Sequence, residues 1–342
     1  MEIKEFDPTR FEDRDWEEYL KFLHSFIKEI YPVDPLPSNE ILKSEVLEPS
    51  KEFDIWRWLA YSQDGEIIGS ALLSYPNEKS PMYNTHKNIG NIEIIVEKKH
   101  RRQGIGTQLL RLLFQKSKEI NREVLQTVTN LKEGREFCLR YGAKIASYRS
   151  INRLYMKDIN WKEMNKWCLE GKRTAKGVTI ETFQDVPEEY IEEFVELYTK
   201  TENLAPDYET GDYKGLKVTT ESRRYSEEFH KKKDFIWTTK VTKEEDGTLS
   251  GFTEIYFNKH LPYAVDQDMT GVLPQYRGKK LGKWLKADML LYIRENYPNI
   301  IFIETGNANN NTPMLSINKR MGFKKHIEEY LMKLDVNNIS ID

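Results

Sequence analysis

Residues 96–110 read VEKKHRRQGIGTQLL, and residues 272–285 read VLPQYRGKKLGKWL. Each stretch starts at the end of an apolar, β-branched run, continues through a basic loop that contains glycine, and enters a segment with leucines at helical spacing. The first amides of a helix lack partners within the helix, and the helix dipole favours an anion beside them. Each stretch therefore predicts a strand, an anion-binding loop and a helix, in that order.

Two familiar phosphate motifs do not fit these loops. Gly104 and Gly106 are followed by Leu109, where the dinucleotide fingerprint needs a third glycine. In the second loop only three residues separate Gly278 from Gly282, whereas a nucleotide-triphosphate loop needs four. A pyrophosphate still fits both loops, because glycine lets the backbone approach it and the basic side chains supply charge.

The segments around the two loops follow the same order. In the first half, a helical pattern over residues 11–31 precedes strand-like runs at residues 56–62, 67–75 and 89–97. From residue 178 a helix, a hairpin, a strand, a basic loop and a second helix follow again. The loops align with an offset of about 176 residues, which indicates an internal structural duplication.

The duplication predicts two domains, and a chain of 342 residues exceeds the usual size of one domain. A helical, basic segment connects the two repeats. The predicted boundaries are 1–157 for the N-terminal domain, 158–177 for a linker helix, 178–336 for the C-terminal domain and 337–342 for a tail.

Composition indicates a globular protein. Hydrophobic residues make up 39% of the chain and the formal net charge is only −3, so no field of one sign favours nucleic acid or a membrane as partner. The two cysteines and six histidines show no disulfide framework and no paired ligand spacing, so we expect no metal site. The first twenty residues lack the pattern of a signal peptide. We expect a cytoplasmic monomer or homodimer.

The loop sequences carry a family resemblance. Residues 101–106, RRQGIG, resemble the Gln/Arg-x-x-Gly-x-Gly/Ala signature of the GNAT superfamily of N-acetyltransferases. Residues 277–286, RGKKLGKWLK, and 305–323, TGNANNNTPMLSINKRMGF, are similar to tandem GNAT proteins related to mycothiol synthase. Together the two resemblances cover nearly the whole chain.

The resemblance implies an α/β (α+β) fold class with two tandem GNAT folds. Each fold would be a mixed, mostly antiparallel twisted sheet, split by a cofactor cleft and flanked by helices. The implied cofactor is acetyl-CoA, with its pantetheine arm against the strand that ends at Val96 or Val272. The cofactor-binding residues expected from the resemblance are Val96, Arg101, Arg102, Gln103, Gly104, Ile105, Gly106, Thr107, Val272, Arg277, Gly278, Lys279, Lys280, Leu281, Gly282, Lys283, Asn307 and Asn311.

Two of these positions have a further property. Lys280 stands where the general signature has its first glycine, and a side chain there leaves the amides free only if the position does not need a positive φ. Asn311 precedes Thr312 and Pro313, so it also suits the N-cap of a helix.

The attacking amine is largely an ammonium, so the reaction needs a base. In many family members the base is a carboxylate six residues before the closing valine of the strand. That position is Asp266 in the second half and Gly90 in the first. Asp266 shares strand parity with Asp268 and Thr270. Glu254, on the preceding strand, is the alternative base.

The family often uses a tyrosine, four residues before the last glycine, to return a proton to the CoA thiolate. Cys138 and Asn318 occupy those positions here. Asparagine does not supply a proton, so water or another residue such as Tyr330 takes this role, or the step proceeds without an acid.

The resemblance implies an acetyltransferase that moves an acetyl group from acetyl-CoA to a primary amine of a small molecule. The amine attacks directly in a ternary complex, and the C-terminal domain is the expected catalyst. The alternative is an acyl-CoA-binding regulatory protein in which one or both domains are catalytically silent. We expect the acceptor to lie over residues 203–213, whose acidic and aromatic side chains suit a cation.

Overall fold

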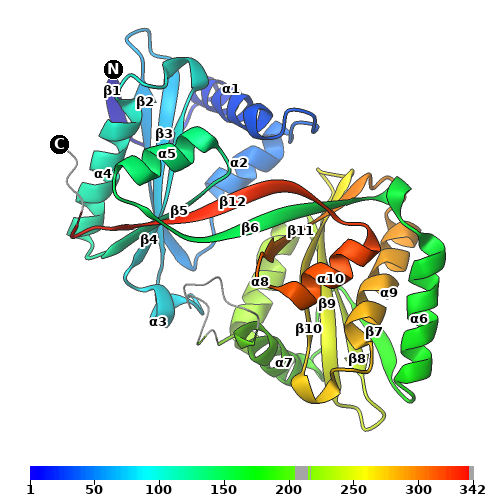
Figure 1. The fold of residues 1–342 in the computed structure, drawn as a ribbon. Helices are drawn as coiled ribbons and strands as arrows, with labels where there is room; N and C mark the ends of the chain where they lie inside the picture. The colour runs from blue at the N-terminus through cyan, green and yellow to red at the C-terminus, as the bar shows by residue number, and fades with distance from the viewer. Residues whose placement is uncertain (205–214, 216, 339–342) are drawn as a thin grey trace. The chain divides into compact units, whose positions relative to one another are not determined.

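The structure of the chain is a computed structural model that describes residues 1–204, 215 and 217–338. It contains two compact units (Figure 1). Unit 1 comprises Met1–Tyr148 and the residues from Glu329 onward, and unit 2 comprises Arg149–Glu328.

Unit 1 is built from a sheet and helices on both of its faces. Its helices are α1 (Asp13–Ile30), α2 (Asn39–Leu47), α3 (Tyr83–His86), α4 (Ile105–Glu119) and α5 (Lys132–Arg140), with 3-10 turns η1 (Pro8–Arg10) and η2 (Lys98–His100). Its strands are β1 (Glu2–Glu5), β2 (Phe53–Tyr61), β3 (Ile67–Pro76), β4 (Ile89–Val96) and β5 (Val124–Thr129). The strands β6 (Lys144–Tyr155) and β12 (Lys324–Asp335) have residues in both units.

Unit 2 repeats this order of elements. Its helices are α6 (Trp161–Thr174), α7 (Ile191–Asn203), α8 (Thr220–Lys232), α9 (Leu281–Asn296) and α10 (Thr312–Met321), with 3-10 turns η3 (Met156–Asp158) and η4 (Pro274–Tyr276). Its strands are β7 (Thr179–Phe183), β8 (Phe235–Lys243), β9 (Leu249–Asn258), β10 (Ala264–Val272) and β11 (Phe302–Ala308).

Each sheet is antiparallel except for one neighbouring pair. The strand order is β1-β2-β3-β4-β5-β12 in unit 1 and β6-β11-β10-β9-β8-β7 in unit 2. The parallel pairs are β4 with β5 and β10 with β11, which are the strands before and after the helix that follows each basic loop. A mixed, mostly antiparallel sheet flanked by helices was expected for each repeat, and that expectation is confirmed.

The closing strands of the two sequence halves are exchanged. Residues 330–335 of β12 pair with β5 in unit 1, and Met332 and Leu334 are buried in that unit's core. Residues 149–155 of β6 pair with β11 in unit 2, where Leu154 is buried. The units of the structure therefore divide the chain at 148/149 and 328/329, whereas the sequence alone suggests 157, 177 and 336 as boundaries.

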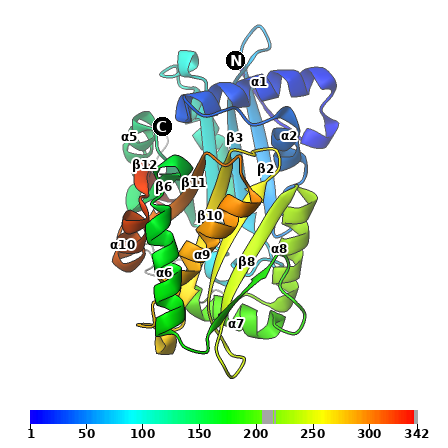
Figure 2. The same cartoon turned by 90° about the vertical axis from the view of Figure 1, so that its right-hand side faces the viewer.

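Helix α6, expected as a linker, is part of the core of unit 2. It lies beside α9 (Figure 2), and Met164 and Trp167 are buried in the same cluster as Trp284. A Cβ atom at Gly171 would lie 2.5 Å from Trp284, so glycine is needed where the two helices meet. Packing of α6 and α9 covers the face of the sheet on which Val265 and Ile303 lie.

The opposite face of that sheet is covered by α7 and α8. Phe194 of α7 packs against Phe252 of β9, with ring centroids 5.4 Å apart. Helix α8 was not expected, because its sequence TESRRYSEEFHKK is almost entirely polar. It forms because Thr219 and Ser222 make a capping box, and because Arg223 and Glu227 are buried as an ion pair.

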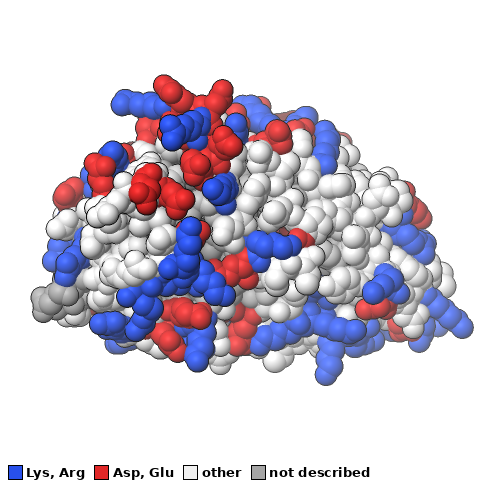
Figure 3. Space-filling model, turned by 90° about the horizontal axis from the view of Figure 1, so that it is seen from above, with Lys and Arg blue, Asp and Glu red and all other residues white. Residues whose placement is uncertain are grey.

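Among the described residues, no helix has the length and apolar character needed to span a membrane. Basic and acidic side chains are interspersed on the face shown in Figure 3, so that face does not present a field of one sign.

Candidate active site

Strands β10 and β11 separate part of the way along their length. Their parallel pairing covers Ala264 with Phe302, Val265 with Ile303, and Asp266 with Glu304, and it ends there. On its other side β10 has a bulge between Gln267 and Thr270, where its pairing with β9 shifts register. A bulge re-aims the backbone and leaves one residue out of the ladder, so the strand turns away from its neighbour.

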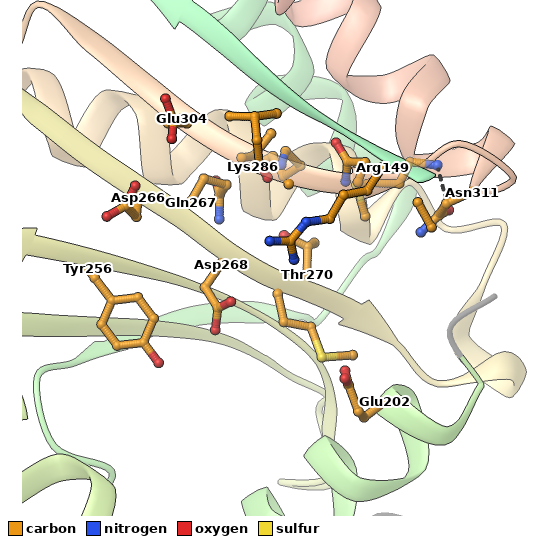
Figure 4. A pocket seen from close by; sticks show the side chains of 17 residues that line it. Arg149, Glu202, Tyr256, Asp266, Gln267, Asp268, Thr270, Lys286, Glu304 and Asn311 are labelled. Atoms are coloured by element: carbon orange, nitrogen blue, oxygen red, sulfur yellow. Dashed lines mark hydrogen bonds between the residues drawn. The ribbon is translucent and has the colours of Figure 1, made fainter. Parts of the chain in front are cut away.

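A pocket of about 430 Å³ lies at this separation (Figure 4). All of its lining residues belong to unit 2. They are Arg149, Ile151, Glu202, Tyr256, Asp266, Gln267, Asp268, Met269, Thr270, Lys286, Glu304, Thr305, Gly306, Asn307, Ala308, Asn311 and Met314.

Side chains from both faces of the sheet line the pocket. Ile303 packs in the core beneath α9, so the alternation along β11 places Thr305 and Asn307 on that face. Glu304 lies on the opposite face with Asp266, its partner in the ladder. The gap between the strands therefore connects a face lined by carboxylates with a face lined by neutral polar groups and α9.

Asp266 and Asp268 are the two carboxylates of β10 in the pocket, and they lie on the same side of it in Figure 4. Both side chains are exposed to solvent in the pocket, and the protein around the pocket reduces the hydration of their charged forms. Loss of hydration raises the pKa of Asp266 to about 6, with a further contribution from the negative charge of Glu304. The pKa of Asp268 is raised to about 7, first by desolvation and then by Glu254.

Asp266, Asp268 and Thr270 were expected to point to the same face of β10, and this holds only in part. Thr270 hydrogen-bonds Thr253 at 2.7 Å, and Gln267 donates to Thr253 at 3.1 Å. The expectation that Asp266 and Thr270 share a face is wrong, because the bulge between Gln267 and Thr270 changes the parity of the strand.

Glu254, the alternative base, is fully buried and does not line the pocket. Its Oε1 atom lies 2.9 Å from Arg223 Nη2 and accepts a 2.6 Å hydrogen bond from Thr239. Arg223 also donates to Glu227 at 2.8 Å. The carboxylate of Glu254 is therefore part of a buried ion network, with Arg223 and Glu227, outside the lining of the pocket.

Two of the predicted cofactor residues, Asn307 and Asn311, line the far wall of the pocket. Asn311 caps α10 by accepting a hydrogen bond from the amide of Met314 at 3.3 Å. Asn307 Oδ1 accepts from Asn318 Nδ2 at 2.8 Å, which fixes the Asn307 side chain against α10. Both asparagines thus have a structural contact and also face the pocket.

The two basic loops have the same backbone conformation. Arg102 and Gly104 have φ values of 64° and 83° in unit 1, and Gly278 and Lys280 have φ values of 86° and 65° at the matching positions in unit 2. Position 280 was expected not to need a positive φ. Lys280 has a positive φ, so that expectation is wrong. Each loop places one glycine and one longer residue in left-handed conformations, at a cost of about 1–2 kcal/mol for the non-glycine residue.

The helices that follow the loops start without a side-chain cap. The first backbone hydrogen bonds within them are made by the amides of Gln108 and Trp284. The amides before them lack intrahelical partners and suit an anion. The predicted loop residues that supply this first turn are Ile105, Gly106 and Thr107 in unit 1, and Leu281, Gly282 and Lys283 in unit 2.

Several of the predicted basic residues already contact other groups. Arg101 Nε donates to the carbonyl of Val96 at 3.0 Å, and its terminal nitrogens pair with Glu29 of α1. Arg277 Nε donates to the carbonyl of Val272 at 3.1 Å in the same way. Both arginines thus fix the end of the strand before the loop.

The remaining predicted side chains lie at the surface of the loops. Lys279 pairs with Glu244 at 3.0 Å and Lys280 with Glu170 at 2.9 Å. Arg102 and Gln103 are exposed, and Thr107 hydrogen-bonds Tyr141 at 2.7 Å. The exposed ion pairs are weak enough for a phosphate to replace them.

Unit 1 has a similar separation of strands with a different set of side chains. Pairing of β4 with β5 ends at Asn91 and Gln126, whose side chains hydrogen-bond each other at 2.7 Å. Pairing of β3 with β4 is continuous, without a bulge. Glu93 lies further along β4, and burial raises its pKa. A Cβ atom at Gly90 would lie 2.8 Å from Leu73 and 3.1 Å from Leu125, so a side chain at that position would require these leucines to move.

Sequence reasoning missed most of the pocket wall. Asp268 has a sequence signal, because it shares strand parity with Asp266. Arg149, Glu202, Tyr256 and Glu304 come from other strands and helices, so no local pattern connects them with β10. Most of the expected acceptor segment, 203–213, lies outside the described residues. Among the described residues, no cluster of His, Cys, Asp and Glu side chains could hold a metal.

Comparisons with known proteins agree with this geometry. Residues 20–142 match the model of the acetyltransferase (GNAT) family. A tandem GNAT protein from the clavulanic acid biosynthesis pathway has a similar fold, with a TM-score of 0.76, 18% identity, and coverage of 98% of both chains. A GCN5-related N-acetyltransferase from Sphaerobacter thermophilus has a TM-score of 0.66 and 15% identity over 98% of this chain and 95% of that chain.

A third solved structure is a GCN5-related glucosamine N-acetyltransferase region of a fungal multi-domain β-N-acetylglucosaminidase. It has a TM-score of 0.66 and 11% identity, and covers 97% of this chain and 38% of that chain. A search of the curated proteins gives no sequence match. The chain is therefore a tandem GNAT protein in fold, and its unit 1 matches the GNAT acetyltransferase family by sequence.

Proposed function

We propose that the protein is an acetyltransferase that moves an acetyl group from acetyl-CoA to a primary amine of a small molecule, and that unit 2 is the catalyst. One observation carries this proposal. Asp266 and Asp268 open into a pocket where β10 and β11 separate, and their pKa values lie close to neutral pH. A base works best when its pKa is near the working pH.

The residues of unit 2 fit the cofactor. The free amides at the start of α9 suit a pyrophosphate, and the separated strands leave backbone groups of β10 unpaired for an extended arm. Bound acetyl-CoA would supply an activated acetyl thioester. Thr270 and Asn307 line the pocket between the loop and the carboxylates, so they are in place to orient that arm.

The carboxylates supply the base. Four acidic side chains line the pocket, and Arg153 neutralises one of them, Glu304, through a 2.6 Å contact. An acceptor ammonium would be held by the remaining negative charge. We propose that Asp266 accepts the proton that leaves this ammonium, directly or through a water, and that Asp268 holds the cationic group in place.

Unit 1 has the features of a cofactor site but lacks the carboxylates. It has the loop and the free helix amides, but the amides Asn91 and Gln126 stand at the end of its parallel ladder. Unit 2 has Asp266 and Glu304 at that place. We propose that unit 1 binds CoA without turnover, which retains part of the regulatory alternative.

The test is release of free thiol from acetyl-CoA in the presence of small primary amines, including diamines and amino sugars. At least one amine should increase the rate over hydrolysis, and Asp266→Asn should lower kcat by about 10²-fold or more. The Asp64→Asn variant, in an exposed turn of unit 1, is the control. If CoA binds tightly and no amine is acetylated, the protein is an acyl-CoA-binding regulator.

A further inference from the structure

Lys286 is a buried lysine in the pocket of unit 2. It is the sixth residue of α9, its side chain is 1% exposed, and it lines the pocket (Figure 4). Its Nζ atom lies 5.6 Å from the ring centroid of Phe323. Within the described part of the chain, no hydrogen bond or ion pair is made by this amine.

The other buried cations of the described residues have carboxylate partners. Arg153 pairs with Glu304, Arg223 with Glu254 and Glu227, and Lys240 with Asp288 at 2.7 Å. An unpaired buried charge costs several kcal/mol, and a lysine avoids part of that cost by losing its proton more easily. Burial accordingly lowers the pKa of Lys286 to about 7. A leucine or methionine at this position would avoid that cost, so the presence of a lysine points to a role in the pocket.

The position of Lys286 separates it from the carboxylates. It comes from α9, on the face where Val265 and Ile303 pack, whereas Asp266 lies on the opposite face. No carboxylate is among the causes of the lowered pKa of Lys286. The pocket therefore has a base on one side of the strand gap and a potential acid on the other.

Acyl transfer from a thioester leaves an electron pair on sulfur when the C–S bond breaks, and an acid that protonates this sulfur assists the step. Asn318 occupies the position where the family often has a tyrosine, and its amide is bound to Asn307. Tyr330 belongs to the sheet of unit 1. Tyr256 lies on the carboxylate face, and its pKa is raised well above 10 by burial. None of these side chains is suited to give a proton on the face of α9.

We propose that Lys286 is the acid of the reaction and gives its proton to the sulfur of CoA, a role that rests on the proposed acetyl transfer. The nitrogen of the acceptor forms a bond to the acetyl carbon, and the C–S bond breaks with its electron pair on sulfur. The Lys286 ammonium transfers one proton to that sulfur and becomes an amine. It regains a proton from water, while the protons released from the acceptor nitrogen leave through Asp266.

The matching residue of unit 1 agrees with this assignment. Leu110 is the sixth residue of α4, as Lys286 is of α9, and it is buried in the apolar core of its unit. Unit 1 therefore lacks an acid at this place, just as it has Asn91 in place of Asp266. The two differences occur together, on the two sides of the same strand gap.

Lys286→Met tests the proposal, because methionine keeps the length of the side chain and removes the exchangeable proton. Ionisation of the thiol of bound CoA can be followed by thiolate absorbance, without turnover. A thiolate beside Lys286 would keep the lysine protonated, and the ammonium would in turn lower the pKa of the thiol, so the wild-type complex should form thiolate at a lower pH than the Lys286→Met complex. Identical titrations in the two complexes would overturn the proposal, whether or not an acceptor is known.

Activity gives an independent readout. With an amine that turns over, Lys286→Met should lower kcat by about 10²-fold or more, with the dissociation constant of CoA changed by less than about threefold. Its pH profile should lose the falling limb near pH 7. Lys286→Arg keeps a positive charge but does not give up a proton at this pH, so it should not restore kcat. Full activity in the arginine variant would reduce Lys286 to a fixed charge.

Discussion

Asp266 and Glu304 are partners in the last pair of the parallel ladder between β10 and β11, and Arg153 binds Glu304 at 2.6 Å. Arg153 of β6 is paired with Glu304 of β11 in the adjacent antiparallel ladder. One carboxylate of the pair is thus neutralised, while the other opens into the pocket without an ion pair of its own in the described structure. Asp266 and Glu304 therefore have different electrostatic environments, although they are neighbours in the ladder.

Replacement of Asp266 should therefore affect activity and stability in opposite directions. The pKa of Asp266 in the folded protein is about 6, above its unfolded value. Its contribution to stability is complete below the unfolded pKa and is lost as pH rises through about 6. Asp266→Asn should therefore gain thermal stability relative to wild type between pH 4 and pH 8, while kcat falls.

Thermal unfolding at pH 4 and pH 8 measures this prediction. Asp64→Asn, in an exposed turn, is the control: its melting temperature should differ from that of the wild type by the same amount at both pH values. A stability difference for Asp266→Asn that shrinks toward pH 8 would contradict the raised pKa.

A second prediction tests whether Glu254 stabilises the fold or acts as the catalytic base. Its carboxylate and that of Glu227 share Arg223, and all three side chains are buried. Removing one partner of a buried ion pair leaves a charge undercompensated and costs about 3 kcal/mol. Glu254→Gln should lower the free energy of unfolding by about that amount, similar to Glu227→Gln, and should change kcat by less than about threefold. A loss of kcat at unchanged stability would instead make Glu254 the base.

Six residues before the closing valine, the sequence has a carboxylate that lines the pocket in unit 2, but in unit 1 the same spacing gives a residue at a different place in the ladder. Six residues before the closing valine is Asp266 in β10 and Gly90 in β4. The bulge adds one residue to β10, so Asp266 corresponds to Asn91 of unit 1, and its ladder partner Glu304 corresponds to Gln126. A bulge has no reliable sequence signal here. Residue type and spacing predicted the two folds and the loops, whereas the register of the strands had to come from the structure.

The parts of the site that the sequence left out depend on distant segments. Lys286 reads as part of an amphipathic helix until the packing shows that its position is buried and faces the pocket. No helix was expected from the polar sequence of α8, because its contacts become evident only when Arg223 and Glu227 are seen beneath β9. Such residues are specified by contacts across the fold, which local patterns do not contain.

Cofactor stoichiometry is a third prediction. Both loops leave amides free at a helix start, so calorimetry should find two CoA sites in the full chain. Gly104→Asp should remove one site and Gly282→Asp the other, because a carboxylate beside these amides repels phosphate. The variants Gly104→Asn and Gly282→Asn have the same size without the charge, so they should lose less affinity. One site in wild type would contradict the symmetric reading of the loops.

The left-handed residues of the loops give a fourth prediction. Lys280 has a φ of 65°, and its Nζ atom pairs with Glu170 at the surface. Lys280→Gly and Lys280→Ala both lose that pair, but only glycine relieves the backbone strain. Chemical denaturation should show Lys280→Gly to be more stable than Lys280→Ala by about 1 kcal/mol. Arg102→Gly and Arg102→Ala should differ in the same direction, and equal stabilities in either pair would show that the position is not left-handed in solution.

The exchanged closing strands give the fifth prediction, because each sequence half stabilises the other unit. Met332 is fully buried in the core of unit 1, although it lies near the C-terminus, and Leu154 is fully buried in unit 2, although it comes from the first half. Either residue replaced by alanine should cost about 2–5 kcal/mol. Hydrogen exchange should locate the loss: Met332→Ala should accelerate exchange in α4, and Leu154→Ala should accelerate it in α9. The opposite assignment would mean that each half closes its own sheet.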